Sequence, residues 1–328
     1  MNLALRSEPL PWMAFATRRM PPRLTAPMAL QLDRAMAKAL PAVLADHRDA
    51  VQMVHVLLQR LLQRDDQTER VQVDVLVRGI RQALRDAVSW HPAGPLDQLV
   101  RSDMREIMDM PWSPPWLHNA EMRWLDKLNI QMGSYARWMA LVLQAVAQTP
   151  WARIEDVAAG SGGFLRWMAR HSPRKDLHLS CSDLAPGYVA TGERLAAHNP
   201  PEALPLRCQV RDATRLADLN GAVDLITCTQ STHHLPPGLI VQLIHQGLAV
   251  APCGVVIVDI LRSLGNVLGA WLATTLSTPA PPLTLDGMQS ARRGLLPSEL
   301  ALYATLAGAG QIETQALGPA FVVLRAGR

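Results

Sequence analysis

The sequence predicts an α/β protein in which a helical extension precedes a seven-stranded, mostly parallel sheet. Short apolar runs alternate with helical segments from Trp151 onward, which is typical of a parallel sheet with helices on both faces. A glycine-rich loop follows the first of these runs, where a strand would turn into a helix. Only Gly318-Pro319 separates the last two runs, so we expect them to pair antiparallel.

The composition is that of a globular protein with an apolar core. Of the 328 residues, 49% are apolar and 18% are charged, which excludes disordered and collagen-like chains. The net charge of +4 is too small to indicate a nucleic-acid partner. The four cysteines form no C-x-x-C pair, so we expect buried thiols rather than a zinc ribbon.

We expect a cytoplasmic protein without a membrane span. The N-terminus shows no basic stretch leading into an apolar core, as a signal peptide would. The longest apolar run, Val267–Leu276, is too short to cross a bilayer. Cysteines that stay reduced also suit the cytosol.

Residues 1–110 are expected to form the helical extension. Apolar residues recur at three- and four-residue steps from Val51 to Leu62 and again from Val75 to Val88, as one face of a helix requires. These helices carry more apolar surface than a helix lying alone on a sheet needs. We therefore predict that the extension forms a substrate cap, a homodimer interface or both.

Seven strands are predicted in residues 151–328. Their ranges are Arg153–Ala159, Leu177–Asp183, Leu206–Arg211, Val223–Thr229, Val255–Ile260, Gln311–Leu317 and Ala320–Leu324. Helices are predicted at Tyr188–His198, Leu239–Ala249 and Ser298–Ala307. Residues 261–293 are expected to form either a wall of the site or a solvated insertion.

The loop after the first predicted strand is the strongest indication of a binding site. Glycines at positions 160 and 162 let the backbone turn sharply and approach a ligand, beside the free N–H groups of a helix start. Acids lie within or at the ends of the first three strands, at Asp156, Asp183 and Asp212, and parallel strand ends share one crevice. There Asp183 can accept both hydroxyls of a ribose, and Asp212 can contact an adenine edge. Taken singly, the loop also fits a plain turn, and each acid also fits a helix cap.

A nicotinamide dinucleotide is the obvious rival ligand. Its G-x-G-x-x-G fingerprint requires a third glycine where this chain has Leu165. The closing strand pair is also foreign to the usual dinucleotide-binding sheet.

On these residues, the stretch from about Arg153 to Arg328 resembles the class I S-adenosylmethionine-dependent methyltransferases. The family has a D-x-G-x-G-x-G loop, an acid after the second strand, an Asp-Ala pair after the third and a reversed last strand. The matching residues are Asp156, Ala158, Gly160, Gly162, Asp183, Asp212 and Ala213, with Ala158 departing at the first glycine. Leu125–Asn129 and Asp259–Ser263 are similar to the small-molecule branch, which acts on polyketide, quinone or phenolic metabolites.

The resemblance implies a Rossmann-like class I methyltransferase fold with S-adenosylmethionine as cofactor. It implies methyl transfer to a hydroxyl of an aromatic or polyketide-like small molecule. Transfer to carbon or nitrogen, or a non-methylating cyclase or binding protein, are the alternatives. The expected cofactor contacts are Asp156, Ala158, Ala159, Gly160, Gly162, Asp183, Leu184, Asp212, Ala213 and Thr229.

The resemblance also implies a helical lid over the crevice, which we assign to residues 111–150. This lid would bring Tyr135 and Trp138 to the acceptor, and Arg262 would reach it from the opposite wall. Packing of the aromatic residues between helices is the alternative. Asn199-Pro200-Pro201 resembles a motif of DNA methyltransferases, but it precedes the third strand, so we interpret it as a turn.

Two consecutive histidines follow the fourth strand, beside the expected position of the transferable methyl group. A phenol has a pKa of about 10, and a histidine with a pKa near 6.5 can take its proton during the attack. An extended segment points neighbouring side chains to opposite sides, so we favour His233 as the base and His234 as packed or capping. No metal is expected, because no H-x-x-x-H and no nearby carboxylate pair accompanies them.

Overall fold

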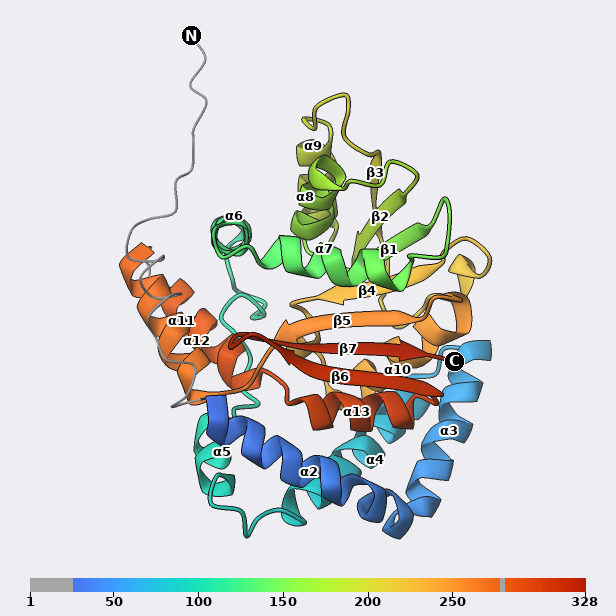
Figure 1. Cartoon of the computed structure of the whole chain (residues 1–328), viewed down its shortest axis with the longest axis vertical. Helices are drawn as coiled ribbons and strands as arrows, with labels where there is room; N and C mark the ends of the chain where they lie inside the picture. Colours follow the sequence, from blue (N-terminus) through green and yellow to red (C-terminus); the bar gives the residue numbers. More distant parts are fainter. Residues whose placement is uncertain (1–25, 278–280) are drawn as a thin grey trace.

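The computed structural model describes residues 26–277 and 281–328, whose centre is a seven-stranded sheet (Figure 1). The strand order is β3-β2-β1-β4-β5-β7-β6, and neighbours pair in parallel except β7, which is antiparallel to β5 and β6. The strands are β1 (Arg153–Val157), β2 (His178–Asp183), β3 (Leu206–Val210), β4 (Leu225–Thr229), β5 (Val255–Ile260), β6 (Gln311–Leu317) and β7 (Phe321–Gly327).

Helices precede the sheet and connect its strands. They are α2 (Ala26–Asp46), α3 (Arg48–Gln63), α4 (Gln67–Asp86), α5 (Gly94–Val100), α6 (Pro115–Gln131), α7 (Ser134–Ala145), α8 (Gly163–His171), α9 (Pro186–Ala196), α10 (Pro237–Val250), α11 (Leu264–Ser277), α12 (Pro281–Arg293) and α13 (Pro297–Leu306), with short 3₁₀ turns η1 (Ala217–Leu219) and η2 (Thr232–His234). Within the described ranges, no helix has the length and apolarity needed to cross a membrane.

The sheet confirms the predicted fold class, including the reversed last strand. All seven predicted strands form, with their ends shifted by a few residues. The first strand ends at Val157 because Ala158 has a φ of 51°, which lies outside the extended region. The Asn199-Pro200-Pro201 segment lies in the turn between α9 and β3, as interpreted.

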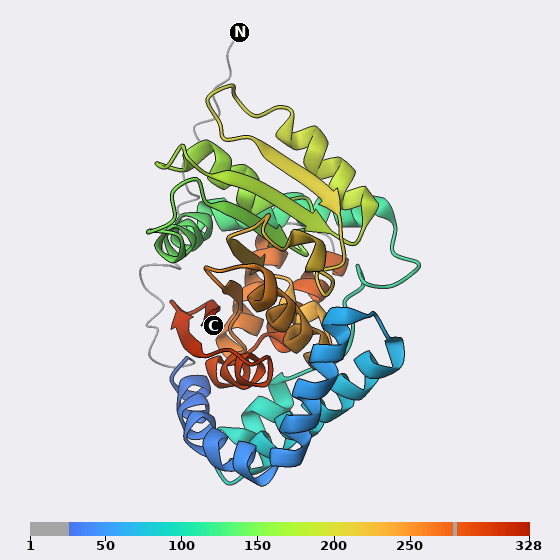
Figure 2. The ribbon, with the colours of Figure 1, turned by 90° about the vertical axis from the view of Figure 1, so that its right-hand side faces the viewer.

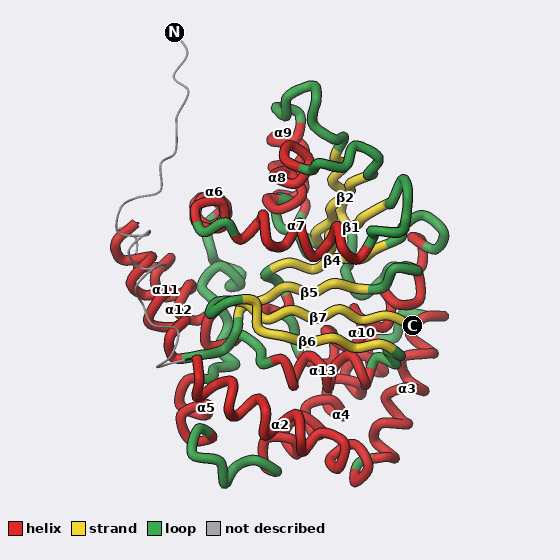
Figure 3. The backbone as a smooth tube through the Cα atoms, viewed as in Figure 1, coloured by secondary structure: helices red, strands yellow, loops and turns green. Residues whose placement is uncertain are grey.

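Helices cover both faces of the sheet, as the pattern predicted. On one face, α7 and α8 bury Trp138, Phe164 and Leu165 in a cluster that includes strand residues. On the other face, α10 and α13 cover β4, β5 and β7 in a second cluster. Figure 3 shows the strands side by side between these two groups of helices.

The extension, from α2 to α5, packs outside α10 and α13 and shares their hydrophobic cluster (Figure 2). Asp66 begins α4 by accepting hydrogen bonds from the backbone N–H groups of Thr68 and Glu69. The approach of α4 to α10 is so close that a Cβ at Gly238 would lie 2.4 Å from the Cα of Asp74. Much of the apolar surface that prompted the prediction of a cap or a dimer interface is therefore buried within the chain. Residues 1–25 of the predicted extension lie outside the described ranges.

A buried ion cluster fastens the extension to α13. Glu299 has no exposed surface and accepts hydrogen bonds from Arg81 at 2.9 Å and Arg85 at 2.8 Å. Arg262, which is 1% exposed, donates to Glu299 and to Asp97, both at 2.7 Å. Burial alone would raise the pKa of Glu299, but the three arginines hold it well below its ordinary value. The expectation that Arg262 contacts the acceptor is therefore wrong, since its guanidinium is used inside the fold.

Residues 261–293 contain the helices α11 and α12, which pack against each other at the same end of the sheet as α6 (Figure 1). Asp286 of α12 accepts hydrogen bonds from the backbone N–H groups of Ile107 and Met108, at 2.6 and 3.0 Å. Helix α12 thereby positions the segment 101–114, which connects α5 to α6.

Candidate active site

The glycine loop between β1 and α8 adopts an alternating left-handed conformation. Ala158, Gly160 and Gly162 have φ angles of 51°, 56° and 70°. A side chain at such an angle costs roughly 1–2 kcal/mol, so Ala158 strains the loop where the family has glycine. The loop is held from β2, because the N–H of Ala159 donates to the Ser182 carbonyl at 2.9 Å.

Two glycines of this loop allow close packing. A Cβ at Gly162 would lie 2.7 Å from the Sγ of Cys181, and one at Gly163 would lie 1.8 Å from Oδ1 of Asp126. The second contact brings α6 directly against the start of α8. Gly163 was not among the predicted site residues, because its requirement comes from a helix that is distant in the sequence.

The acid at the end of β2 lies beside the loop, where the sequence placed it. Asp183 accepts a hydrogen bond from the N–H of Gly160 at 2.8 Å and another from the N–H of Ala185 at 2.9 Å. Burial raises the pKa of Asp183 above its ordinary value. The next residue, Leu184, leaves 68% of its surface exposed, which provides an aliphatic surface beside the carboxylate.

Asp156 is used inside the sheet rather than at its edge. The residue is 1% exposed, and its carboxylate accepts hydrogen bonds from the hydroxyls of Thr227 at 2.7 Å and Thr229 at 3.1 Å. Burial raises the pKa of Asp156 to about 7. The expectation that Asp156 and the Thr229 hydroxyl contact the cofactor directly is therefore wrong. They hydrogen-bond to each other and connect the end of β1 to β4.

The third predicted acid stabilises its own turn. Asp212 accepts hydrogen bonds from the N–H and the hydroxyl of Thr214, at 2.9 and 2.6 Å. Its other oxygen lies 3.6 Å from Arg70 of α4 and 3.5 Å from Arg215. Ala213, in the same turn, packs against the core cluster. The structure thus places this turn at the edge of the sheet and connects it to the extension.

Helix α6 covers the glycine loop and the end of β4. A Cβ at Gly160 would lie 3.1 Å from the Sδ of Met122. Asn129 donates a hydrogen bond at 2.6 Å to the side chain of Gln230, whose φ of 52° is unusual for a residue other than glycine. Strained residues concentrate at functional sites, so Gln230 joins the candidate site. No motif in the sequence indicated it.

The two aromatic residues expected at the acceptor belong to the core. Tyr135 is 4% exposed and donates its hydroxyl proton to Asp126 at 2.6 Å. Trp138 is 1% exposed and packs edge-to-face against Phe164 and Phe321. The alternative interpretation, packing between helices, is therefore the correct one for both.

The histidine pair lies in η2, directly after β4, and each ring is fixed by a carboxylate. Nδ1 of His233 lies 2.6 Å from Asp259, a residue with no exposed surface at the end of β5. Nδ1 of His234 lies 3.0 Å from Asp109. The ring centroids are 4.3 Å apart. Because η2 is a tight turn and not an extended segment, the two side chains do not point to opposite sides, as we expected.

The Nε2 atoms of both histidines face Glu106. Nε2 of His233 lies 3.7 Å from Oε1 of Glu106, and Nε2 of His234 lies 3.9 Å from Oε2. Glu106 is 1% exposed, and its Oε1 has no hydrogen-bond partner among the described residues. The expectation that no carboxylates accompany the histidines is therefore wrong. Both Glu106 and Asp109 come from the segment 101–114, which the sequence pattern did not connect to the site.

Acidic side chains and Arg293 surround His234 and act on its pKa in opposite directions. Burial alone would lower the pKa of His234, but Glu106 and Asp109 raise it to about 9. Burial, Asp286 and Glu106 raise the pKa of Glu121, on α6, to about 8. The cluster therefore attracts a positive charge, whether a proton or a cation.

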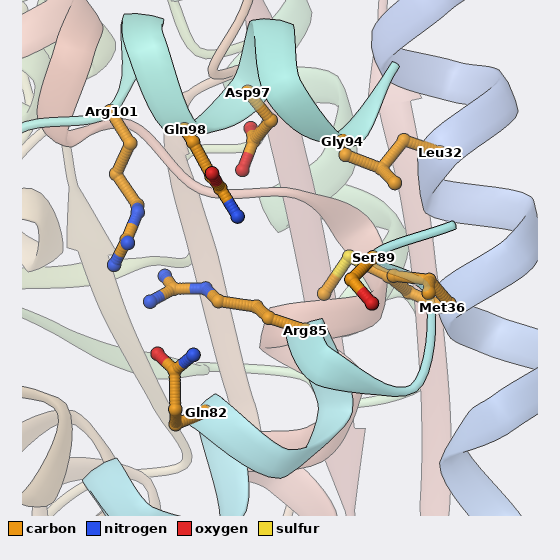
Figure 4. Close-up of a pocket in the computed structure, with 10 residues that line it drawn as sticks. Leu32, Met36, Gln82, Arg85, Ser89, Gly94, Asp97, Gln98 and Arg101 are labelled. Carbon is orange, nitrogen blue, oxygen red and sulfur yellow. The ribbon is translucent and has the colours of Figure 1, made fainter. Parts of the chain in front are cut away.

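A pocket of about 300 Å³ opens beside the histidine pair. Its cationic lining residues are Arg78, Arg81, Arg101, Arg105 and Arg293. A second pocket, between α2, α4 and α5, has only about 30 Å³, which is room for a water molecule. Figure 4 shows Arg85 and Arg101 reaching into that smaller space. The larger pocket is therefore the candidate entrance for an acceptor.

Comparisons with known proteins agree with this arrangement. Residues 154–251 match a family model described as a methyltransferase domain. The chain has no significant match among curated proteins.

Several solved structures are similar to this chain. An O-methyltransferase family protein from Burkholderia thailandensis has 15% identity and a TM-score of 0.46, over 75% of this chain and 70% of that one. The magnesium protoporphyrin IX methyltransferase from Synechocystis PCC 6803 has 13% identity and a TM-score of 0.41, over 76% and 99%. A SAM-dependent methyltransferase from Aquifex aeolicus has 14% identity and a TM-score of 0.40, over 57% and 88%.

Proposed function

We propose that this chain is a class I S-adenosylmethionine-dependent methyltransferase that methylates a hydroxyl of an aromatic or polyketide-like small molecule, assisted by its histidine pair. The cofactor, when bound, supplies an electrophilic methyl group on a sulfonium. Everything else, namely the positioning of both partners and the handling of the acceptor proton, falls to residues of the chain.

The glycine loop fits such a cofactor. Its left-handed residues, Gly160 and Gly162, carry no side chain that would fill the cradle beside β2. The Asp183 carboxylate is on the same edge and suits a pair of ribose hydroxyls, while exposed Leu184 suits the face of an adenine. Helix α6 packs against the loop through Met122, which supports its assignment to the proposed lid.

The observation that carries the proposal is the fixed histidine pair after β4. In an open parallel sheet, ligands bind beyond the carboxyl ends of the strands, and the pair lies there on two carboxylate supports. A hydroxyl acceptor needs help in losing its proton near neutral pH, whereas the lone pair of a weakly basic amine such as an aniline does not. Buried carboxylates beside two imidazoles provide that help, and this favours a hydroxyl acceptor over nitrogen.

The proposed partner is a small molecule, which would enter through the larger pocket. A homodimer is not part of the proposal, because much of the apolar surface of the extension is covered by α10 and α13. Transfer to carbon and a non-methylating cofactor-bound role remain the rival functions, and the following experiment separates them.

Incubation of the full chain with methyl-labelled S-adenosylmethionine tests the proposal. The acceptor panel should pair phenols with matched anilines and with ring-activated, O-protected analogues, and mass spectrometry should locate the label. We expect methyl ethers of phenols. Label only on nitrogen or carbon would replace the hydroxyl by another acceptor, and absence of any labelled product would favour the non-methylating role.

A cofactor-site variant makes this assay specific. Asp183→Ala should weaken S-adenosylmethionine binding at least about tenfold, since hydrogen bonds to charged groups contribute about 1.5–3 kcal/mol. Glu313→Ala, on exposed β6 far from the loop, is the matched control and should leave the calorimetric affinity unchanged. Equal affinities for the two variants would contradict the assignment of Asp183.

A further inference from the structure

We propose that Glu106, His233 and His234 bind a divalent transition-metal ion, of the class of Zn²⁺, at the acceptor side of the site. The inference rests on the proposed function, since it names an ion that would help the acceptor hydroxyl to ionise. It changes how the histidines assist: they act through Nε2 as ligands, and not as bases.

The three side chains have the separations that a small ion requires. One ligand atom from each lies within 4.8 Å of the other two, and the Nε2–Oε distances are 3.7 and 3.9 Å. Tetrahedral zinc with bonds of about 2.0–2.2 Å places neighbouring ligands roughly 3.3–3.6 Å apart. Because the three ligand atoms lie up to 4.8 Å apart, side-chain shifts of up to about 1 Å would bring them to these separations.

The supports of the histidines are those of metal-binding imidazoles. Such rings characteristically donate their second N–H to a carboxylate, which fixes the tautomer and leaves the other nitrogen for the metal. Here Nδ1 of His233 is paired with Asp259 and Nδ1 of His234 with Asp109, so both Nε2 atoms remain for one ligand. Asp259 is itself fixed by the backbone N–H groups of His233 and Ile260, at 2.9 and 2.7 Å.

The backbone around the ligands is also held in place. Arg293 donates to the carbonyl of His233 at 2.8 Å and to that of His234 at 2.9 Å. On the opposite side, Asp286 holds the N–H groups of the two residues that follow Glu106. The site is therefore preformed by three separate parts of the chain: the segment 101–114, η2 and α12.

An independent observation points to a ligand at this position. Glu106 is 1% exposed, and its Oε1 accepts no hydrogen bond within the described ranges, although leaving a buried carboxylate oxygen unpaired is costly. This oxygen lies 3.7 Å from Nε2 of His233, and the other oxygen of Glu106 lies 3.9 Å from Nε2 of His234. A cation between them would satisfy all three groups at once. A proton satisfies only one imidazole at a time, because two imidazolium rings at 4.3 Å would repel.

Two histidines and one carboxylate leave a coordination position open, as in catalytic zinc sites. The adjoining pocket, which His233 and His234 line, gives an acceptor access to that position. A hydroxyl that occupies it loses its proton more readily, because the charge of the ion stabilises the oxyanion. The O–H electron pair stays on oxygen, the proton passes to solvent in the pocket, and the oxyanion is the nucleophile for the methyl group.

Metal binding to the full chain tests the inference directly. After chelation and dialysis, the protein should be titrated with Zn²⁺, Mn²⁺ and Mg²⁺ by calorimetry, and with Co²⁺ by visible absorption. We expect one Zn²⁺ per chain with micromolar or tighter affinity, and a tetrahedral Co²⁺ spectrum without the thiolate band that a cysteine site would give. Glu106→Gln and His234→Ala should each weaken Zn²⁺ binding by at least about 100-fold. Removing a residue that only hydrogen-bonds to a metal ligand weakens binding by about 10–100-fold, and removing the ligand itself should weaken it at least as much.

Glu313→Gln is the control, since Glu313 is an exposed acid of the edge strand β6, outside the histidine cluster. It should keep the wild-type stoichiometry, and circular dichroism should show that all variants fold. Zn²⁺ binding that is absent in the wild type, or unchanged in Glu106→Gln, overturns the inference. The methyl-transfer assay on the chelated protein then decides the proposed function separately: undiminished transfer without metal would leave the histidines as bases.

Discussion

At the scale of single residues, Ala158 stands where the methyltransferases that this chain resembles have glycine, and the difference has a measurable cost. The φ of Ala158 is 51°, where an L side chain costs about 1–2 kcal/mol and glycine costs nothing. Glycine loses about 0.5–1 kcal/mol through the entropy of the unfolded chain. Ala158→Gly should therefore stabilise the protein by about 0.5–1 kcal/mol in chemical denaturation. Its neighbour Ala159 has no positive φ, so Ala159→Gly should destabilise the protein. Equal destabilisation by the two variants would show that Ala158 is not strained.

Asp156 predicts a pH dependence of stability. Its pKa in the folded protein is about 7, whereas the unfolded value is near 3.8. Burial raises the pKa, and the hydrogen bonds from Thr227 and Thr229 lower it by less. The folded state therefore holds the proton more strongly, so the free energy of unfolding falls as pH rises from about 4 to 7 and is level above. The negative charge of the neighbouring Glu155 also raises the pKa of Asp156.

Asp156→Asn should remove this contribution, and the difference between the two unfolding curves isolates it from other acids such as Glu121. We expect the wild type to lose stability relative to the variant between pH 4 and 7. Two curves that run parallel over this range would show that Asp156 does not carry a raised pKa.

Which residues the sequence identifies depends on how far apart their partners lie. Asp183 was found because a strand end and a glycine loop identify it locally. Trp138 and Arg262 were assigned wrongly, because the burial of a side chain by a distant helix cannot be deduced from its own neighbours in the sequence. Glu106 and Asp109 were missed for the same reason: they reach His233 and His234 only through the fold.

At the scale of elements, the contact between α6 and the start of α8 is the most restrictive in the site. A Cβ at Gly163 would lie 1.8 Å from Oδ1 of Asp126 and 2.8 Å from the hydroxyl of Tyr135, so the Asp126 carboxylate would have to leave its hydrogen bonds to Tyr135 and Arg166. Gly163→Ala should destabilise the protein by about 1–3 kcal/mol, as overpacking does, and weaken cofactor binding. The readouts are chemical denaturation and calorimetry.

Gly187→Ala provides the control at the second residue of α9. No heavy atom lies within 4 Å of the Cβ it would add, so this change should be neutral or stabilise by up to about 1 kcal/mol. If Gly163→Ala behaved like the control, α6 would not be packed on the loop.

The strands were predictable because each is a short apolar run between turn residues. Helices α11 and α12 were not predicted as such, since their apolar residues follow no single amphipathic face that stands out from the loop before them. The tight turn η2 was also missed. It decides the site, because it makes both Nε2 atoms converge where an extended segment would separate them.

At the scale of the whole molecule, the extension is a structural part of the sheet domain. It contributes Arg81 and Arg85 to the buried Glu299 and shares a core cluster with α10 and α13. The chain that follows it, 101–114, carries Glu106 and Asp109 to the histidines. The fold class was evident from residues 151–328 alone, but the completed site depends on residues before them.

Comparing the turnover numbers of the wild type and His233→Ala tests whether the histidine pair assists methyl transfer to a hydroxyl. With labelled S-adenosylmethionine and a phenolic acceptor at neutral pH, His233→Ala should lower the turnover number by about 10²–10⁴, while the calorimetric affinity for the cofactor stays near wild type. The loss should shrink as pH approaches the pKa of the phenol, because the acceptor then ionises without help. If His233→Ala turned over as fast as the wild type at neutral pH, His233 would not assist methyl transfer.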